Sequence, residues 1–143
     1  MAVFATEGQF SRFSSLVKIS DTPEKFELHT LLATANEAAQ TTYTLGTVLG
    51  KVTTTGKWKV AVATATDGSQ TPSAIYLADG KMGAIVDSTI PATTDTLVLV
   101  LKQGKVIVAR EALKLDASFS TTVLKQGAYD ALSSIGLFVE ATA

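Results

Sequence analysis

The chain has 143 residues, enough for one domain with a sizeable buried core and too few for two. Hydrophobic residues make up 46% and charged residues only 17%, so some apolar surface is expected to stay uncovered in a monomer, which favours an oligomer or a binding partner. The 12 basic and 13 acidic residues nearly cancel, and the sequence lacks a basic run, which argues against direct nucleic-acid binding.

The first 42 residues carry the weakest secondary-structure signal. Phe4, Phe10 and Phe13 are spread among glycine, serine, glutamate and glutamine without regular spacing, a composition typical of an arm that orders on contact with a partner. An ordinary first strand over residues 14–19 explains the segment equally well. Both interpretations stay open at this point.

The next segment gives conflicting signals. Residues 21–24 combine aspartate, proline and glutamate in an order that can start a helix. Residues 26–32, however, alternate between apolar and other side chains, and this period of two favours a strand. Residues 34–42 are small and polar, and we expect them to connect the N-terminal segment to the core.

Residues 45–77 contain the clearest strand pattern of the chain. A β-rich run over 45–52 is followed by a threonine cluster with Gly56 and then by a return strand over 58–62, which predicts a hairpin. Trp58, Val60 and Val62 fall on one face of the return strand. A polar loop over 66–72, with turn residues Asp67 and Gly68, then leads to an apolar strand over 73–78.

The following third of the chain is expected to contribute further strands. A turn over 78–81 precedes a short strand over 82–86, and Pro91 predicts a loop over 87–95. Residues 96–102 are apolar on both faces, as in a strand buried on two sides or covered on one side by a partner subunit. Gly104 lies in a predicted turn that leads back into a strand over 106–108.

One helix is predicted, over residues 119–135. Apolar residues recur at helical spacing, namely Val123, Leu124, Gly127, Ala128, Ala131, Leu132 and Ile135. Gly136 follows where a left-handed residue ends a helix, and residues 137–139 resume as a strand. Strands outnumber helices, so the predicted fold is mainly β with one C-terminal helix.

The sequence offers little that could support catalysis. His29 is the only histidine and has no orienting carboxylate among its neighbours, and there are no cysteines for disulfides, thiolate ligands or nucleophiles. The aspartates at 67, 79, 87 and 95 each lie in a turn segment, where they bond to their own backbone. We therefore predict no enzyme activity, no cofactor and no metal.

The sequence also lacks a signal-peptide pattern and an apolar run long enough for a bilayer, so a soluble protein without membrane contact is expected.

Three pieces of sequence, in this order and spacing, resemble one family. They are GTVLGKVT with GKW (residues 46–58), TDGSQTPSAIYL (residues 66–77) and ALSSIGLFV (residues 131–139). Together they resemble the head-decoration proteins of tailed phages, a family best known from phage lambda. The resemblance extends over residues 43–139, while residues 24–42 and 114–122 depart from the family's common sequence pattern.

The resemblance implies a small β-barrel or β-sandwich-like fold with an extended N-terminal arm (arm and connector 1–42, trimerising core 43–143). It implies a capsid decoration, or cement, protein on the outer surface of the virion, assembled in the host cytoplasm. Homotrimers would sit at three-fold positions of the expanded head and hold the major capsid protein lattice against internal DNA pressure. The residues concerned are Val3, Phe4, Phe10 and Phe13 for capsid binding by the arm; Trp58, Leu97, Leu99, Leu132, Ile135 and Phe138 for the trimer interface or core; and Gly56, Asp67, Gly68, Gly104 and Gly136 for structural turns.

Without the resemblance, the residues indicate a mainly β binding or assembly module. An alternative from another class is a carbohydrate- or cell-surface-binding β module, for which Trp58, Tyr76 and Tyr129 would supply aromatic platforms. Such platforms must be exposed to stack on a sugar. Their burial therefore distinguishes the two alternatives.

Overall fold

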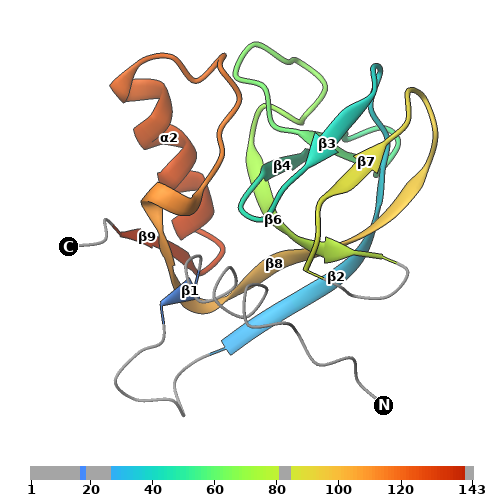
Figure 1. Ribbon diagram of the computed structural model, residues 1–143. Coiled ribbons are helices and arrows are strands. Elements are labelled where there is room, and N and C mark those ends of the chain that lie inside the picture. The colour runs from blue at the N-terminus through green and yellow to red at the C-terminus, as the bar shows by residue number, and fades with distance from the viewer. Residues whose placement is uncertain (1–16, 19–26, 81–84, 141–143) are drawn as a thin grey trace, which may run out of the picture.

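The computed structural model describes residues 17–18, 27–80 and 85–140, and its centre is a closed barrel (Figure 1). The strands pair around a ring in the order β8–β2–β5–β4–β6 and back to β8. The prediction of a mainly β fold with a small barrel and a C-terminal helix is confirmed. The barrel strands are β2 (Glu27–Ala35), β4 (Val48–Lys51), β5 (Trp58–Val60), β6 (Pro72–Asp79) and β8 (Thr96–Ala109).

The predicted hairpin is the β4–β5 pair. Leu49 lies opposite Val60 and Lys51 opposite Trp58 in an antiparallel register. Gly56 turns the chain with a φ of 70°, in the left-handed region that glycine enters without strain. The return strand ends at Val60, two residues before the predicted end.

Strand β8 is longer than predicted, and the turn predicted at Gly104 is wrong. Residues 103–105 continue the strand because they pair with residues 27–29 of β2. His29 pairs with Gln103 and Thr30 with Leu101, so Lys102 is the extra residue of a β-bulge. A bulge bends a strand without ending it. Beyond the bulge, β8 pairs with β1 (Val17–Lys18) on one side and β9 (Leu137–Glu140) on the other.

Two short strands outside the barrel form an antiparallel ribbon, β3 (Thr41–Tyr43) with β7 (Ser88–Ile90). The sequence predicted a loop for 87–95 and a connector for 34–42, and both predictions are wrong for the residues in strands. Pro91 permits a strand that ends just before it, because the missing N–H is then not needed. The strand predicted over 82–86 lies largely outside the described residues.

The barrel separates two apolar cores, and alternation along each strand assigns side chains to one or the other. The inner core gathers residues from all five barrel strands and the ribbon, including Trp58, Tyr76 and Val100. The outer core lies between the barrel and the C-terminal elements and includes Leu101 and Leu132. Between Val98 and Leu101, strand β8 therefore faces apolar surroundings on both sides, as its sequence indicates.

Helix α2 (Thr122–Ser133) covers the outer core beside β6 and β9 (Figure 1). It is shorter than the predicted 119–135, because the Thr121 side chain accepts a hydrogen bond from Leu124 N and so caps the first turn. Gly136 follows the last turn with a φ of 87°, as predicted. A 3-10 turn, η2 (Arg110–Ala112), precedes the helix.

The prediction of an apolar stripe that is buried along the whole helix is only half correct. Ala128 and Leu132 are buried in the outer core, whereas Val123 and Leu124 in the first turn are exposed. The first turn of α2 extends past the outer core, so these two side chains stay in contact with solvent.

Candidate assembly surface

The residues predicted for capsid binding, Val3, Phe4, Phe10 and Phe13, lie outside the described residues. The role of the arm therefore stays a prediction. The described part of the chain contributes other candidates, since it exposes large apolar side chains in separate places on its surface.

The first place is the outer face of β2 and β8, here called the sheet patch and defined by Leu32 and Leu97. Their side chains are 53% and 47% exposed. Leu32 lies opposite Leu99, two residues from Leu97, so Leu32 and Leu97 are diagonal neighbours on one face. The neighbouring residues Ala33 and Val98 point into the inner core. The sheet patch is therefore a consequence of the same alternation that fills the barrel.

The second place is the first half of α2, here called the helix patch and defined by Val123 and Leu124. Val123 is 81% exposed, which is unusual for a branched apolar side chain. The two residues border a groove of about 230 Å3 between the helix and the segment at Pro72, with Phe119 and Ala128 in its wall. The two patches differ, since the helix patch borders this groove and neither Leu32 nor Leu97 lines it.

The structure sorts the predicted interface or core residues into two groups. Trp58 lies in the inner core and Leu132 in the outer core, while Leu99 and Ile135 are partly buried against the outer core. Leu97 and Phe138 are exposed. The sequence did not single out Leu32 or Val123 as surface residues, because the register of β2 and the start of the helix decide their exposure.

The exposed aromatic platforms of the alternative module are not present at two of the three positions. Trp58 and Tyr76 are buried, and the Tyr76 hydroxyl contacts the Ser88 hydroxyl at 2.5 Å and donates to the Val86 carbonyl at 2.7 Å. Only Tyr129 keeps partial exposure. Stacking on a sugar by Trp58 or Tyr76 would require the barrel to open.

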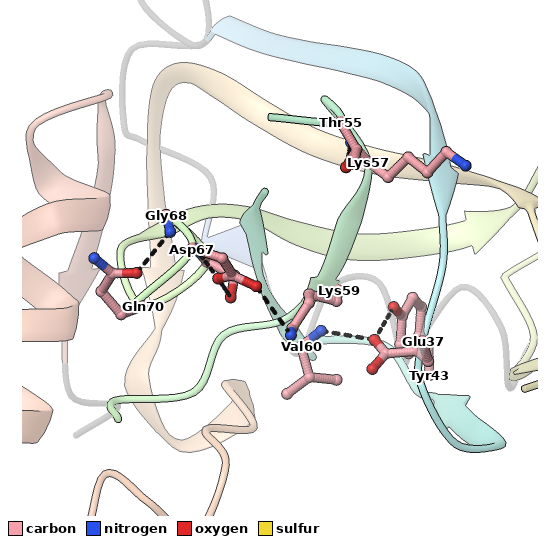
Figure 2. A network of polar contacts seen from close by, with 10 residues as sticks. Glu37, Tyr43, Thr55, Lys57, Lys59, Val60, Asp67, Gly68 and Gln70 are labelled. Carbon is pink, nitrogen blue, oxygen red and sulfur yellow. Dashed lines mark hydrogen bonds and ion pairs between the residues drawn. The ribbon is translucent and has the colours of Figure 1, made fainter. Parts of the chain in front are cut away.

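The turn at Asp67 and Gly68 is held by a polar network (Figure 2). Asp67 Oδ1 accepts hydrogen bonds from Ser69 N at 3.0 Å and Ser69 Oγ at 2.5 Å, and Lys59 Nζ lies 3.3 Å from Oδ2. Gly68 has a φ of 104° and donates its N–H to Gln70 Oε1 at 2.9 Å. The Ser69 hydrogen bonds, and secondarily Lys59, lower the pKa of Asp67 to about 2.

We expect the Asp67 carboxylate to titrate near pH 2 in the folded protein, against an ordinary value of 3.8. Because the folded-state pKa is the lower one, the carboxylate stabilises the turn fully above pH 3.8, and this contribution is lost as the pH falls toward 2. Carboxyl NMR shifts of Asp67 against pH measure the midpoint. Ser69→Ala should raise the pKa more than Lys59→Met, and a wild-type midpoint near 3.8 would contradict the assignment.

A buried carboxylate joins three segments near the open end of the β4–β5 hairpin (Figure 2). Glu37 Oε2 accepts hydrogen bonds from the Tyr43 hydroxyl and from Val60 N, the latter at 2.8 Å. The backbone carbonyl of Glu37 also accepts a hydrogen bond from Thr93 N at 2.7 Å. The pKa of Tyr43 is raised well above its ordinary value, mainly by burial of the hydroxyl. The hydrogen bond to Glu37 and the negative charge of Glu37 raise it further. This role of Glu37 was not predictable from sequence, because Glu37 stands among small polar residues.

Within the described ranges, no group of three or more acidic or histidine side chains is placed to hold a metal ion. No helix there is both long and apolar enough to cross a membrane. The closed five-stranded ring defines a small barrel domain with apolar patches exposed on its surface.

The chain belongs to the bacteriophage lambda head decoration protein D family, whose model matches residues 27–137. The match runs from the start of β2 to the start of β9 and confirms the resemblance seen in the sequence. The curated proteins and the solved structures contain no significant match. Family membership indicates a structural role in decorating the phage capsid and a location on the virion.

Proposed function

We propose that this protein is a cement protein that binds as a homotrimer at three-fold positions on the outer surface of the expanded head. There it holds neighbouring major capsid subunits together against the pressure of packaged DNA. Assembly takes place in the host cytoplasm. The observation that carries the proposal is the family match over residues 27–137, which includes every barrel strand.

The two unlike apolar patches support a cyclic trimer. In a ring with three-fold symmetry, each contact is heterologous, so every subunit presents one surface to one neighbour and a different surface to the other. The sheet patch exposes Leu32 and Leu97, and the helix patch borders a groove. We propose that the sheet patch of one subunit packs against the helix patch of the next.

We expect Leu97→Glu and Val123→Glu each to convert the trimer to monomers at micromolar concentration. Each change places a carboxylate in an apolar contact, where an unpaired charge is strongly unfavourable. Multi-angle light scattering measures the mass, and Lys125→Glu, an exposed change on the same helix, should leave the trimer intact.

Mixing the two variants provides a sharper test of the heterologous arrangement. A Val123→Glu subunit keeps its sheet patch and a Leu97→Glu subunit keeps its helix patch, so one unaltered contact can form between them. The equimolar mixture should therefore form dimers that neither variant forms alone. If the mixture stays monomeric, the two patches are not partners.

We expect deletion of residues 1–13 to abolish binding to expanded heads while the trimer mass and melting temperature stay nearly unchanged. Three arms act together from one trimer, so their loss removes the gain from effective concentration as well as the individual contacts. Co-sedimentation with expanded and with immature heads measures binding, and the full-length protein should bind only the expanded form. Undiminished binding by the truncated trimer would assign recognition to the barrel.

A further inference from the structure

The chain contains two Asp-Gly sequences, at 67–68 and 79–80. Asp-Gly is the dipeptide in which a backbone nitrogen most easily attacks the preceding side chain, because glycine has no Cβ to hinder the approach. Asp67 is exposed and Gly68 half-buried in a surface loop, and loops are where such chemistry is normally fastest. Its polar contacts, however, occupy both reacting groups.

We propose that Asp67–Gly68 is a latent isomerisation site that the folded turn keeps closed. In the reaction, Gly68 N attacks Cγ of the neutral Asp67 carboxyl group, a new N–C bond forms, and the amide proton leaves with the carboxyl hydroxyl as water. Addition of water to either carbonyl of the resulting succinimide ring gives aspartate or isoaspartate. The only co-reactant is water, and the net result is one extra methylene in the main chain.

The nucleophile is restrained by its hydrogen bond and its packing. Gly68 N–H donates to Gln70 Oε1 at 2.9 Å, and the carbonyl of Asp67 accepts from Thr53 N at 2.9 Å. A Cβ at Gly68 would lie 2.2 Å from Thr53 Oγ1, so the glycine packs closely against the turn that follows β4. Movement of Gly68 N toward the carboxyl carbon would break these contacts.

The electrophile is restrained as well, because only the neutral carboxyl group reacts readily. Two Ser69 hydrogen bonds hold the carboxylate in its ionised form. A pKa of about 2 in place of 3.8 reduces the neutral fraction at physiological pH roughly 60-fold. The two restraints act on different atoms and are therefore separable by mutation.

Isomerisation would damage the barrel locally. Ser69 is completely buried, and a Cβ at Gly50 would lie 2.1 Å from the Ser69 carbonyl oxygen, so the turn packs directly on β4. An added methylene at residue 67 would displace Ser69 from this site. Protection of the turn thus preserves the hairpin during long storage, whatever surface the protein decorates.

The test compares isoaspartate formation in the native protein and in guanidinium-denatured protein at the same pH and temperature. Peptide mapping and enzymatic isoaspartyl methylation locate and quantify the product. We expect residues 67–68 to react at least about tenfold more slowly in the native protein, and Ser69→Ala and Gln70→Ala to accelerate the native reaction several-fold.

Asp79–Gly80 provides an internal reference, because Gly80 N donates to Leu97 O at 3.0 Å and does not depend on Ser69 or Gln70. Its rate should stay constant in the two variants, which excludes general unfolding as the cause of acceleration. Equal rates at 67–68 in native and denatured protein would overturn the proposal. So would Ser69→Ala and Gln70→Ala variants that react no faster than wild type while folded.

Discussion

We expect Gly46→Ala to lower the free energy of unfolding by more than about 3 kcal/mol, or to prevent folding. Gly46 has a φ of 97°, and a positive φ costs a residue with a Cβ about 1–2 kcal/mol. The new Cβ would also lie 2.1 Å from the carbonyl oxygen of Ala112, an atom of the backbone that has no rotamer to move away. Relief of this clash requires displacement of the whole segment that leads to α2.

That segment is attached to the barrel by hydrogen bonds around Gly46. Lys114 N donates to the Gly46 carbonyl at 2.9 Å, Lys114 Nζ to the Leu45 carbonyl at 2.6 Å, and Val48 N to the Lys114 carbonyl at 3.2 Å. A displacement of the segment would weaken all three. Thermal unfolding measures the effect, which should exceed a shift of about 10 °C for a domain of this size.

Gly127→Ala is the matched control for Gly46→Ala. Gly127 lies inside α2, and a Cβ there would meet no atom within 4 Å. Alanine should therefore stabilise the helix by about 0.5–1 kcal/mol through its lower backbone entropy in the unfolded state. Equal melting temperatures of the two variants would show that the close contact at Gly46 is not decisive.

We expect Glu37→Ala to destabilise the protein by about 3–5 kcal/mol, since two buried donors, the Tyr43 hydroxyl and Val60 N, would lose their acceptor at a cost of about 1–3 kcal/mol each. The added cavity increases the effect. Chemical denaturation at pH 7 measures the free energy of unfolding.

Glu37→Gln separates the hydrogen bonds from the cavity, because glutamine has the same shape and keeps one acceptor oxygen. It should cost less than half as much as alanine. If glutamine and alanine destabilise equally, the negative charge itself, and not the acceptor geometry, is what the site requires. If neither substitution changes the free energy of unfolding, the Glu37 carboxylate does not hold the β3–β7 ribbon to the barrel.

The parts of the fold that were predictable from sequence are those set by local pattern. The β4–β5 hairpin combines period-two alternation with a glycine turn, and its register needs no distant partner. The same holds for the two-faced pattern of β8 between Val98 and Leu101, which the inner and outer cores explain. Gly136 was predictable because a helix end requires a left-handed residue there.

The wrong predictions concern residues whose structure depends on a distant strand. Gly104 is typical of a turn, yet pairing with β2 keeps it extended. Residues 88–90 are a strand only because β3 lies beside them. The two exposed patches were harder still to predict from sequence. The exposure of Leu32 and Val123 follows from tertiary packing and not from the residues next to them in the chain.

The position of β8 in the chain has a consequence for biosynthesis. It is the last barrel strand to be made, and it pairs with β1, β2 and β6 before it and β9 after it. Glu27 must find Lys105 and Ala35 must find Thr96, so the contacts that close the barrel are distant in sequence, which slows folding. On the ribosome, the edges of β2 and β6 that pair with β8 therefore stay unpaired until residue 105 has emerged. The barrel can therefore close only after β8 has been translated.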